Sequence, residues 1–140
     1  MPKVTINDSK GLLVEAGSGF YVASNPIASL QSQTAANTIT PGVHLVSGTA
    51  SAITLTLPLA SAVPGGLFVV RSASMHAHIL TGTDSGSECI VAPITGTVGK
   101  QQTGSRLTFT SGVGNSVSLL SDGKNFLVTS QSGSFTYGGS

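Results

Sequence analysis

The pair His76-Ala77-His78 carries the side chains of this chain that are best suited to bind a metal ion. If these residues lie on a β-strand, both imidazoles project from one face and could hold a transition-metal ion together. Two ligands are too few for a closed site within one chain, so such a site would need three copies around a three-fold axis. The alternative, which we favour, places His76 and His78 as polar side chains on the exposed face of a strand whose other face carries Ala77 and Ile79. We therefore expect no metal and no cofactor.

Catalysis requires titratable or nucleophilic groups that are brought together, and this chain supplies few of them. Its five carboxylates are spread along the sequence, and Asp84 and Asp122 lie in Gly- and Ser-containing segments where aspartate commonly forms turns. No serine stands in a G-x-S-x-G elbow. Gly17-Ser18-Gly19 lacks the third glycine of a dinucleotide loop and the Gly-Lys-Ser/Thr of a phosphate loop. We expect no catalytic residues, and hence a protein that is not an enzyme.

Charge is scarce in this chain of 140 residues, because charged side chains make up only 8% of it and the formal net charge is +1. An ordinary globular domain carries roughly 25%. The six Lys and Arg residues are scattered singly, so the clustered positive charge that nucleic acid requires is missing. The most apolar stretch, 50–63, is too short and too rich in hydroxyls to span a membrane. The first ten residues lack the apolar run of a signal peptide, and the single cysteine, Cys89, is consistent with a reducing compartment.

From residue 50 onward, β-branched residues and leucine are interrupted by turn residues about every ten positions, which predicts an all-β fold. Ile53–Leu59 alternates apolar residues with threonine, so we expect one buried and one exposed face, with Pro58 at a strand end or edge. Leu67–Arg71 is apolar on both faces, as in a central strand, and 76–81 is expected to form the next strand. Arg106–Thr110 alternates again, with Leu107 and Phe109 inward. Strands at 117–120 and 126–128 flank an Asp-Gly loop and predict a hairpin. The expected fold is a single-domain antiparallel β-sandwich or barrel.

The two ends of the chain differ from this core. We assign residues 1–50 to an N-terminal arm and strands that make intermolecular contacts, 51–130 to the β core, and 131–140 to a C-terminal arm. Residues 27–37 could form a short helix. The tail carries two aromatic residues that a free segment in water would not need, so we expect it to dock on a neighbouring chain. The candidate interface residues are Phe20, Tyr21, Phe135 and Tyr137.

The order of motifs across residues 53–130 resembles a module of bacteriophage virion proteins. The blocks that carry this resemblance are Leu55-Thr56-Leu57-Pro58, Ala60-Ser61-Ala62, Pro64-Gly65-Gly66, Leu67-Phe68-Val69-Val70, Leu107-Thr108-Phe109 and the segment from Ser116 to Phe126. The last block, S-V-S-L-L-S-D-G-K-N-F, is the most specific. Its usual final residue is Trp or Tyr, and Phe126 keeps the apolar ring without the polar tip.

Modules of this kind are similar to those of capsid decoration (cement) proteins and of tail fibres, both usually trimeric. The resemblance implies a structural virion protein that is made in the host cytoplasm and lies on the capsid surface. It implies binding to the major capsid protein at three-fold or quasi-three-fold sites. It also implies association of this chain with itself as a homotrimer. The alternative is a small head-fibre or tail-fibre component that binds a host surface glycan. The absence of Trp and the presence of only two Tyr argue against a glycan platform.

Overall fold

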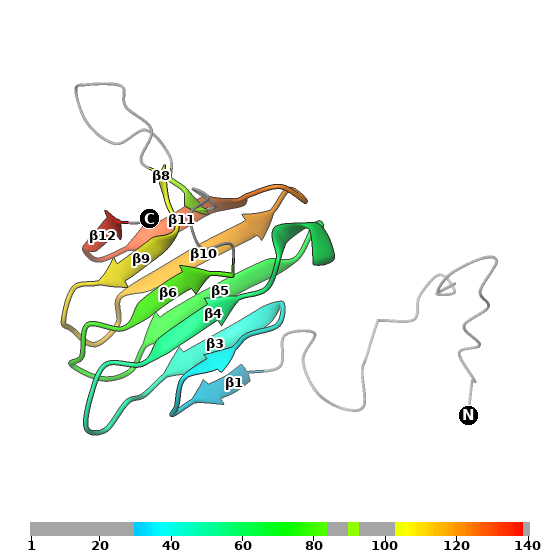
Figure 1. Ribbon diagram of the computed structural model, residues 1–140. Coiled ribbons are helices and arrows are strands. Elements are labelled where there is room, and N and C mark those ends of the chain that lie inside the picture. Colours follow the sequence, from blue (N-terminus) through cyan, green and yellow to red (C-terminus); the bar gives the residue numbers. More distant parts are fainter. Residues whose placement is uncertain (1–29, 84–89, 93–102, 139–140) are drawn as a thin grey trace, which may run out of the picture.

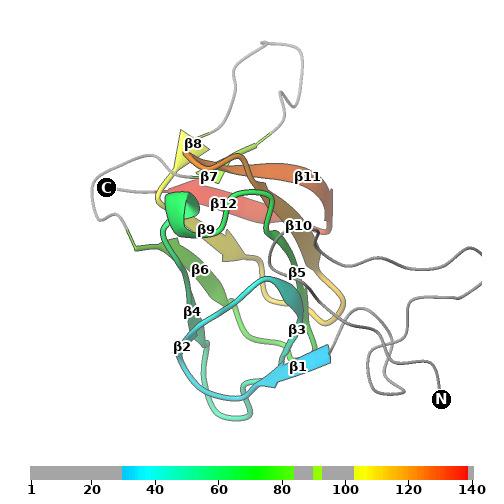
Figure 2. The same ribbon diagram turned by 90° about the vertical axis from the view of Figure 1, so that its right-hand side faces the viewer.

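The computed structural model describes residues 30–83, 90–92 and 103–138, which form two β-sheets packed face to face (Figure 1 and Figure 2). The larger sheet has seven strands in the spatial order β1 (Leu30–Gln33), β3 (Gly42–Val46), β5 (Leu67–Ser72), β10 (Ser116–Ser121), β11 (Phe126–Ser132), β7 (Ile90–Val91) and β8 (Thr103–Gly104). The smaller sheet has five strands in the order β12 (Phe135–Gly138), β9 (Arg106–Phe109), β6 (Ile79–Gly82), β4 (Thr54–Leu57) and β2 (Asn37–Thr38). The described part of the chain contains no α-helix and one 3-10 turn, η1 (Ala60–Ala62), so its all-β character is confirmed.

Strand direction divides the sandwich into two halves. The first six strands alternate between the sheets, so that β1, β3 and β5 are parallel neighbours in the larger sheet and β2, β4 and β6 are parallel neighbours in the smaller one. In the second half, β10 and β11 form the predicted hairpin, and β9 and β12 join β6 by antiparallel pairing. The prediction of an antiparallel sandwich is therefore wrong for the first half, and also for the pair β11–β7, which is parallel. A strand that returns to its own sheet after a circuit through the other sheet pairs in parallel.

The core lies between the sheets and follows from strict alternation along the strands. Leu55 and Leu57 of β4 are buried while Thr54 and Thr56 lie on the outer side, as the sequence pattern predicts. Pro58 follows the last residue of β4, where its missing N–H costs no ladder bond. β5 lies between β3 and β10, which agrees with its predicted central position. Two edge-on aromatic pairs fill the core, Phe68 with Phe126 at a centroid distance of 5.6 Å and Phe109 with Phe135 at 4.9 Å.

Both predictions for the chain ends require correction where the structure describes them. The possible helix at 27–37 is not formed over its described part, since 30–33 is the edge strand β1 beside β3. The proposed C-terminal arm is also part of the sandwich. Residues 131–132 complete β11, and β12 pairs with β9 along its whole length. The aromatic residues of this segment pack against the chain's own core.

Candidate interaction surfaces

His78 is a buried structural residue and not an exposed strand residue. The predicted strand at 76–81 begins only at Ile79, and residues 74–78 fold back so that His78 is 1% exposed. The backbone N–H of Ile53 donates to its Nδ1 at 3.1 Å, and its Nε2 lies 2.8 Å from the Ser74 hydroxyl. Burial lowers the pKa of His78, and the nearby His76 lowers it further. Since Nδ1 accepts a hydrogen bond, the ring is neutral and carries its proton on Nε2.

His44, on the seven-stranded sheet, is also buried and hydrogen-bonded through both ring nitrogens. Its side chain is fully buried on β3, the Gln33 amide donates to its Nδ1 at 3.2 Å, and its Nε2 donates to the Thr40 carbonyl at 2.8 Å. Burial lowers the pKa of His44, and the hydrogen bond to Thr40 opposes part of that shift. Both ring nitrogens are occupied, so neither His44 nor His78 has a free lone pair for a metal.

The geometry does not assemble the His76 and His78 pair into a metal site. Their ring centroids are 6.3 Å apart with an interplanar angle of 76°, so the rings do not project side by side from one strand face. Within the described ranges, no group of three or more His, Cys, Asp or Glu residues is close enough to hold a metal ion. Cys89, Asp84 and Lys100 lie outside these ranges. The burial of His78 follows from alternation once Leu80, and not Ile79, is taken as the inward residue, because positions 78 and 80 lie on the same strand face.

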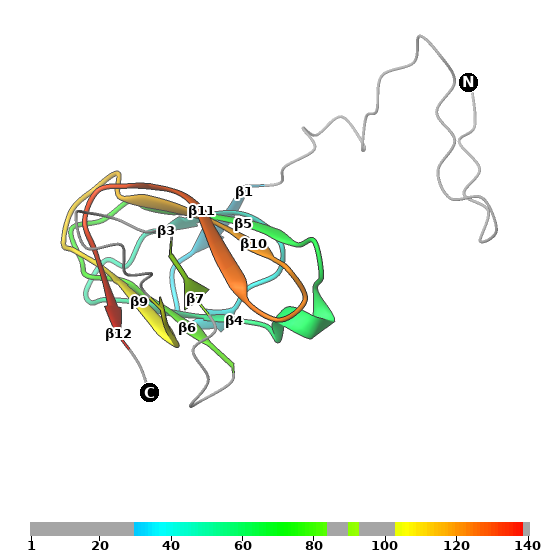
Figure 3. The ribbon, with the colours of Figure 1, turned by 90° about the horizontal axis from the view of Figure 1, so that it is seen from above.

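The two ends of the resembling module meet at one end of the sandwich. The Ser121 hydroxyl, buried at the end of β10, donates to the Ala60 carbonyl of η1 at 2.9 Å. Two backbone bonds reinforce this junction, from Gly65 N–H to the Ser121 carbonyl and from Ser121 N–H to the Gly66 carbonyl, both at 2.9 Å. The turn at 60–66 and the hairpin 116–128 are therefore one packed unit, which lies at the η1 end of the sandwich in Figure 3.

The hairpin loop is closed by Asp122. Its Oδ1 accepts hydrogen bonds from the backbone N–H of Asn125 at 2.6 Å and of Lys124 at 2.7 Å. Gly123, which follows Asp122, has φ +88°. These bonds stabilise the ionised carboxylate and lower the pKa of Asp122. The interpretation of this aspartate as a turn residue agrees with that geometry. Phe126 then enters the core beside Phe68.

Of the four candidate interface residues, the structure describes two. Phe20 and Tyr21 lie outside the described ranges. Phe135 and Tyr137 are partly buried and pack against the core of their own chain. The Tyr137 hydroxyl donates to the Gln131 side chain at 2.7 Å, and partial burial raises the pKa of Tyr137. Much of their apolar surface is thus used within the chain, and docking of this segment on a neighbouring chain stays a prediction.

The outer faces of the two sheets differ in chemistry. On the five-stranded sheet, outward positions are mainly threonines; we call this surface the threonine face, formed by Thr38, Thr54, Thr56, Ile79, Thr81, Thr108, Thr136 and Arg106. On the seven-stranded sheet, more than half of the outward positions are aliphatic; we call this surface the aliphatic face, formed by Leu30, Val43, Leu45, Leu67, Val69, Val91, Leu120 and Leu127. Ser32, Arg71, Ser116 and Ser118 lie at outward register positions between them. Leu30 is 63% exposed and Leu67 is 50% exposed. Sequence reasoning missed this face because it treated the apolar residues of β5 and its neighbours as core.

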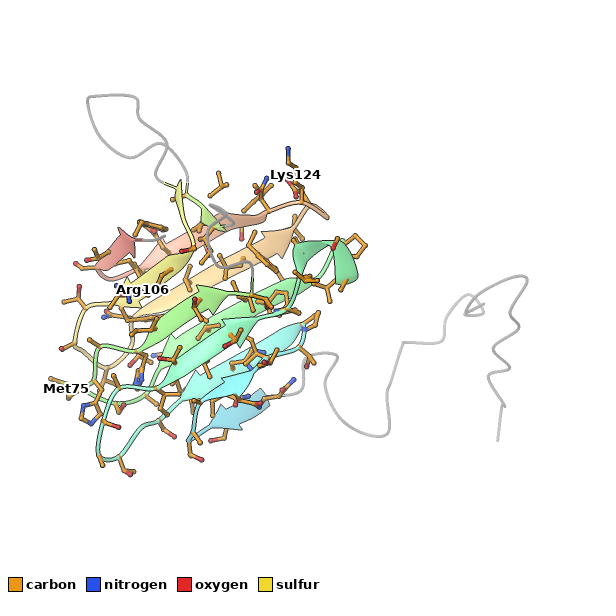
Figure 4. The ribbon with its side chains drawn as sticks, in the orientation of Figure 1. Met75, Arg106 and Lys124 are labelled. Atoms are coloured by element: carbon orange, nitrogen blue, oxygen red, sulfur yellow. The ribbon has the colours of Figure 1, made fainter. Side chains whose placement is uncertain are left out.

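Charged side chains are sparse on the described surface. They number four, Arg71, Arg106, Asp122 and Lys124, and all are exposed. Arg71 lies near the end of β5, Arg106 begins β9, and Asp122 and Lys124 lie on the hairpin loop. Figure 4 shows Lys124 and the exposed Met75 at opposite ends of the sandwich. Among the described residues, no helix is long and apolar enough to cross a bilayer. No protein-family model matches this chain, and no curated protein matches it in sequence.

Proposed function

We propose that this chain is a structural virion protein, a capsid decoration protein that binds the outer surface of a bacteriophage capsid as a homotrimer and stabilises contacts between capsomers. The observation that carries the proposal is the junction of the 60–66 turn with the hairpin 116–128 through Ser121 and Ala60. These segments are the ones on which the resemblance to phage virion modules rests. Their assembly into one unit supports treating the resemblance as a shared folded module and not as a chance order of short motifs.

The surface chemistry favours a role in packing against other proteins. Exposed Ser, Thr and Val side chains lose less conformational entropy on burial than Lys or Glu, and they shed less bound water. Apolar area that is buried against a shell contributes about 25 cal/mol for each Å². A charge-poor sandwich repeated over many sites can therefore stabilise a capsid without any catalytic group.

A fibre component is the second candidate, and the parallel strands of the first half favour it. Strands that stack in parallel after each circuit are the building principle of elongated β-solenoids. The glycan-binding part of this alternative has less support, because Phe68, Phe109 and Phe126 are buried and none of them offers an exposed platform.

The test uses the full chain and capsids assembled from the major capsid protein of the same genome. Cosedimentation with expanded capsids should be saturable at a stoichiometry set by the three-fold or quasi-three-fold sites, and bound protein should raise the temperature at which the capsids rupture. Cosedimentation with unexpanded shells serves as a control for nonspecific adhesion. Binding to neither shell, or binding to a glycan array in place of shells, would overturn the decoration role.

A further inference from the structure

Two connections of the chain meet at one end of the sandwich, and the ring of His78 joins them. One is the β3–β4 connection, residues 47–53, and the other is the β5–β6 connection, residues 73–78. We call the place where they meet the His78 corner. The Ile53 N–H donates to Nδ1 of His78 at 3.1 Å, and the Ser74 hydroxyl lies 2.8 Å from Nε2. One side chain thus ties both connections together.

The His78 corner is closely packed. A Cβ at Gly48 would lie 3.3 Å from Cε1 of His78 and 3.2 Å from the Ile53 side chain. The carbonyl of His78 accepts the N–H of Phe109 at 2.8 Å, which holds the corner against β9. Both His78 and Ile53 are buried. A charge on this ring would therefore be shielded from water and would depend on the few groups inside the corner.

The group that faces Nδ1 cannot adapt to a charged ring. A backbone N–H is a donor only, and a protonated imidazole carries a proton on both nitrogens. In a charged His78, two donors would face each other across the 3.1 Å contact with Ile53. The Ser74 hydroxyl can rotate to suit either state of the ring, but the Ile53 N–H is fixed by the backbone. The corner can therefore close only around a neutral ring.

The other buried histidine, His44, lacks this constraint. Its Nδ1 faces the side-chain amide of Gln33, which can turn over and offer its oxygen, and its Nε2 faces the Thr40 carbonyl. A protonated His44 thus has an acceptor for each of its two N–H groups. The hydrogen-bond geometry distinguishes the two rings and makes His78, not His44, the acid-sensitive contact.

Within the part of the chain that the structure describes, no group is placed to compensate a charge on His78. Residues 47–53 and 107–111 carry no titratable side chain, and in 73–77 only His76 does, with a ring centroid 6.3 Å away. The charged side chains of the described ranges lie on the outer sheet faces or on the hairpin loop: Arg71, Arg106, Asp122 and Lys124. A protonated His78 would thus meet a like charge on His76 and no carboxylate. Burial and His76 lower the pKa of His78 accordingly.

We propose that His78 is an acid-sensitive latch: protonation of its ring releases Ile53 and opens the His78 corner, while the hairpin 116–128 stays folded. Histidine is the side chain whose charge ordinarily changes between pH 5 and 8. Proteins open locally where few contacts hold a segment, without unfolding as a whole. The hairpin contains no histidine, and its Lys124 loop lies at the opposite end of the sandwich from Met75 of the corner (Figure 4). In acid, the open corner uncovers the apolar side chain of Ile53.

Hydrogen exchange of the full chain, followed by NMR at single amides between pH 7.5 and pH 5, tests the latch. After correction for the intrinsic effect of pH, protection of the Ile53 amide should fall by roughly tenfold for each pH unit below the ordinary histidine pKa. The Ile79 N–H, which donates to the Ile53 carbonyl, should follow it. Amides of the β10–β11 hairpin should keep their protection over the same range.

Two variants separate the latch from acid effects elsewhere. His78→Asn offers an oxygen to the Ile53 N–H without titrating, so protection at Ile53 should no longer depend on pH. His44→Gln, whose amide can donate to the Thr40 carbonyl, is the matched control and should open in acid like the wild type. If a variant does not fold, the imidazole nitrogen shifts of the wild type still decide. They should show His78 with its proton on Nε2 and none on Nδ1 at neutral pH.

Equal loss of protection at Ile53 and in the hairpin would overturn the proposal, because acid would then unfold the chain as a whole. Protection at Ile53 that does not change down to pH 5 would also overturn it, as would the same acid response in a folded His78→Asn chain. A proton on Nδ1 of His78 at neutral pH would exclude the latch directly. None of these measurements involves a capsid, so the latch and the proposed function stand or fail separately.

Discussion

The imidazole of His78 replaces a missing backbone partner of Ile53. The parallel ladder between β4 and β6 continues to the Ile53 carbonyl, which accepts the Ile79 N–H at 2.9 Å. The Ile53 N–H has no carbonyl to pair with at that point and donates to His78 Nδ1 at 3.1 Å. The Ser74 hydroxyl is hydrogen-bonded to the other ring nitrogen, Nε2, at 2.8 Å. His78 thus ends the ladder, and it can do so only as a neutral ring, because Nδ1 accepts a hydrogen bond only when it carries no proton.

The first prediction concerns pH. His44 and His78 have a lowered pKa in the folded chain, so below pH 6.5, the ordinary pKa of histidine, the unfolded chain binds more protons than the folded one. The free energy of unfolding should therefore be constant above that pH and should fall as the pH drops from 6.5 toward the folded pKa values. Each proton fully taken up on unfolding contributes a slope of about 1.4 kcal/mol per pH unit. Urea denaturation followed by far-UV circular dichroism between pH 7.5 and pH 5 measures this slope.

The matched variant for that measurement is His78→Asn, whose amide oxygen can accept the Ile53 N–H without titrating. It should reduce the slope by about half, since one of two titrating groups is removed. His76→Gln should retain most of the slope, because His76 affects His78 only through its charge. A stability that does not change between pH 7.5 and pH 5 in the wild type would contradict the neutral, buried assignment of both rings.

The second prediction concerns the junction between the hairpin and the 60–66 turn. Ser121→Ala removes the donor to the Ala60 carbonyl and the acceptor of the Gly123 N–H, so this region loses two hydrogen bonds. We expect a loss of about 1–2 kcal/mol in the free energy of unfolding. Ser118→Ala, on the same strand but with its side chain outward, should change stability by less than about 0.5 kcal/mol. Equal effects of the two substitutions in chemical denaturation would show that the junction contributes nothing specific.

The third prediction concerns the hairpin loop. Asp122→Ala removes the acceptor for two backbone N–H groups and should lower the melting temperature, whereas Asp122→Asn keeps an acceptor oxygen and should melt close to the wild type. Because the pKa of Asp122 is lowered by these bonds, its stabilising effect should be lost as the pH falls below the ordinary carboxylate range. Thermal melting of the three proteins at neutral pH checks the rescue by asparagine. Identical melting of Asp122→Ala and the wild type would exclude this role.

The fourth prediction concerns the connection between β3 and β4. A Cβ at Gly48 would collide with the Ser51 carbonyl and would lie 3.3 Å from Cε1 of His78. Gly48→Ala should therefore destabilise the fold by about 1–3 kcal/mol, as overpacking does. Gly138→Ala adds a Cβ that meets nothing within 4 Å and should leave stability nearly unchanged. Urea denaturation of the two variants side by side measures this difference and tests whether the space around Gly48 is as tight as the structure shows.

Several parts of the fold were predictable because they depend on local pattern. The alternation around Leu55 and Leu57, the inward positions of Leu107 and Phe109, and the Asp-Gly hairpin are each determined within a few residues, and the structure confirms them. Strand direction was not predictable in the same way. Periodicity reports which face of a strand is buried, but it carries no information about the neighbouring strand or its direction.

The histidine assignments show the same limit. His78 was expected on an exposed strand face because Ile79 was assigned to the buried face. In β6 it is Leu80 that is buried, while Ile79 lies on the threonine face, so alternation places His78 on the inner side. Its burial depends on Ile53, which lies 25 residues earlier and whose need for an acceptor arises only when β4 and β6 are paired. Phe135 and Tyr137 were assigned to an arm that docks on a neighbouring chain for a related reason, since the pairing of β12 with β9 has no local signature.

In the first half, each circuit of the chain passes once through both sheets, so further circuits would extend the sandwich along one direction. Gly42 pairs with Phe68, 26 residues later, and Thr54 pairs with Ile79, 25 residues later, so each circuit adds one strand to both sheets at once. Duplication of a gene segment that encodes one such circuit would insert a layer between existing layers and leave the hairpin end unchanged. Sandwiches of different length can therefore descend from one ancestor by whole-circuit duplication, without a new core having to evolve.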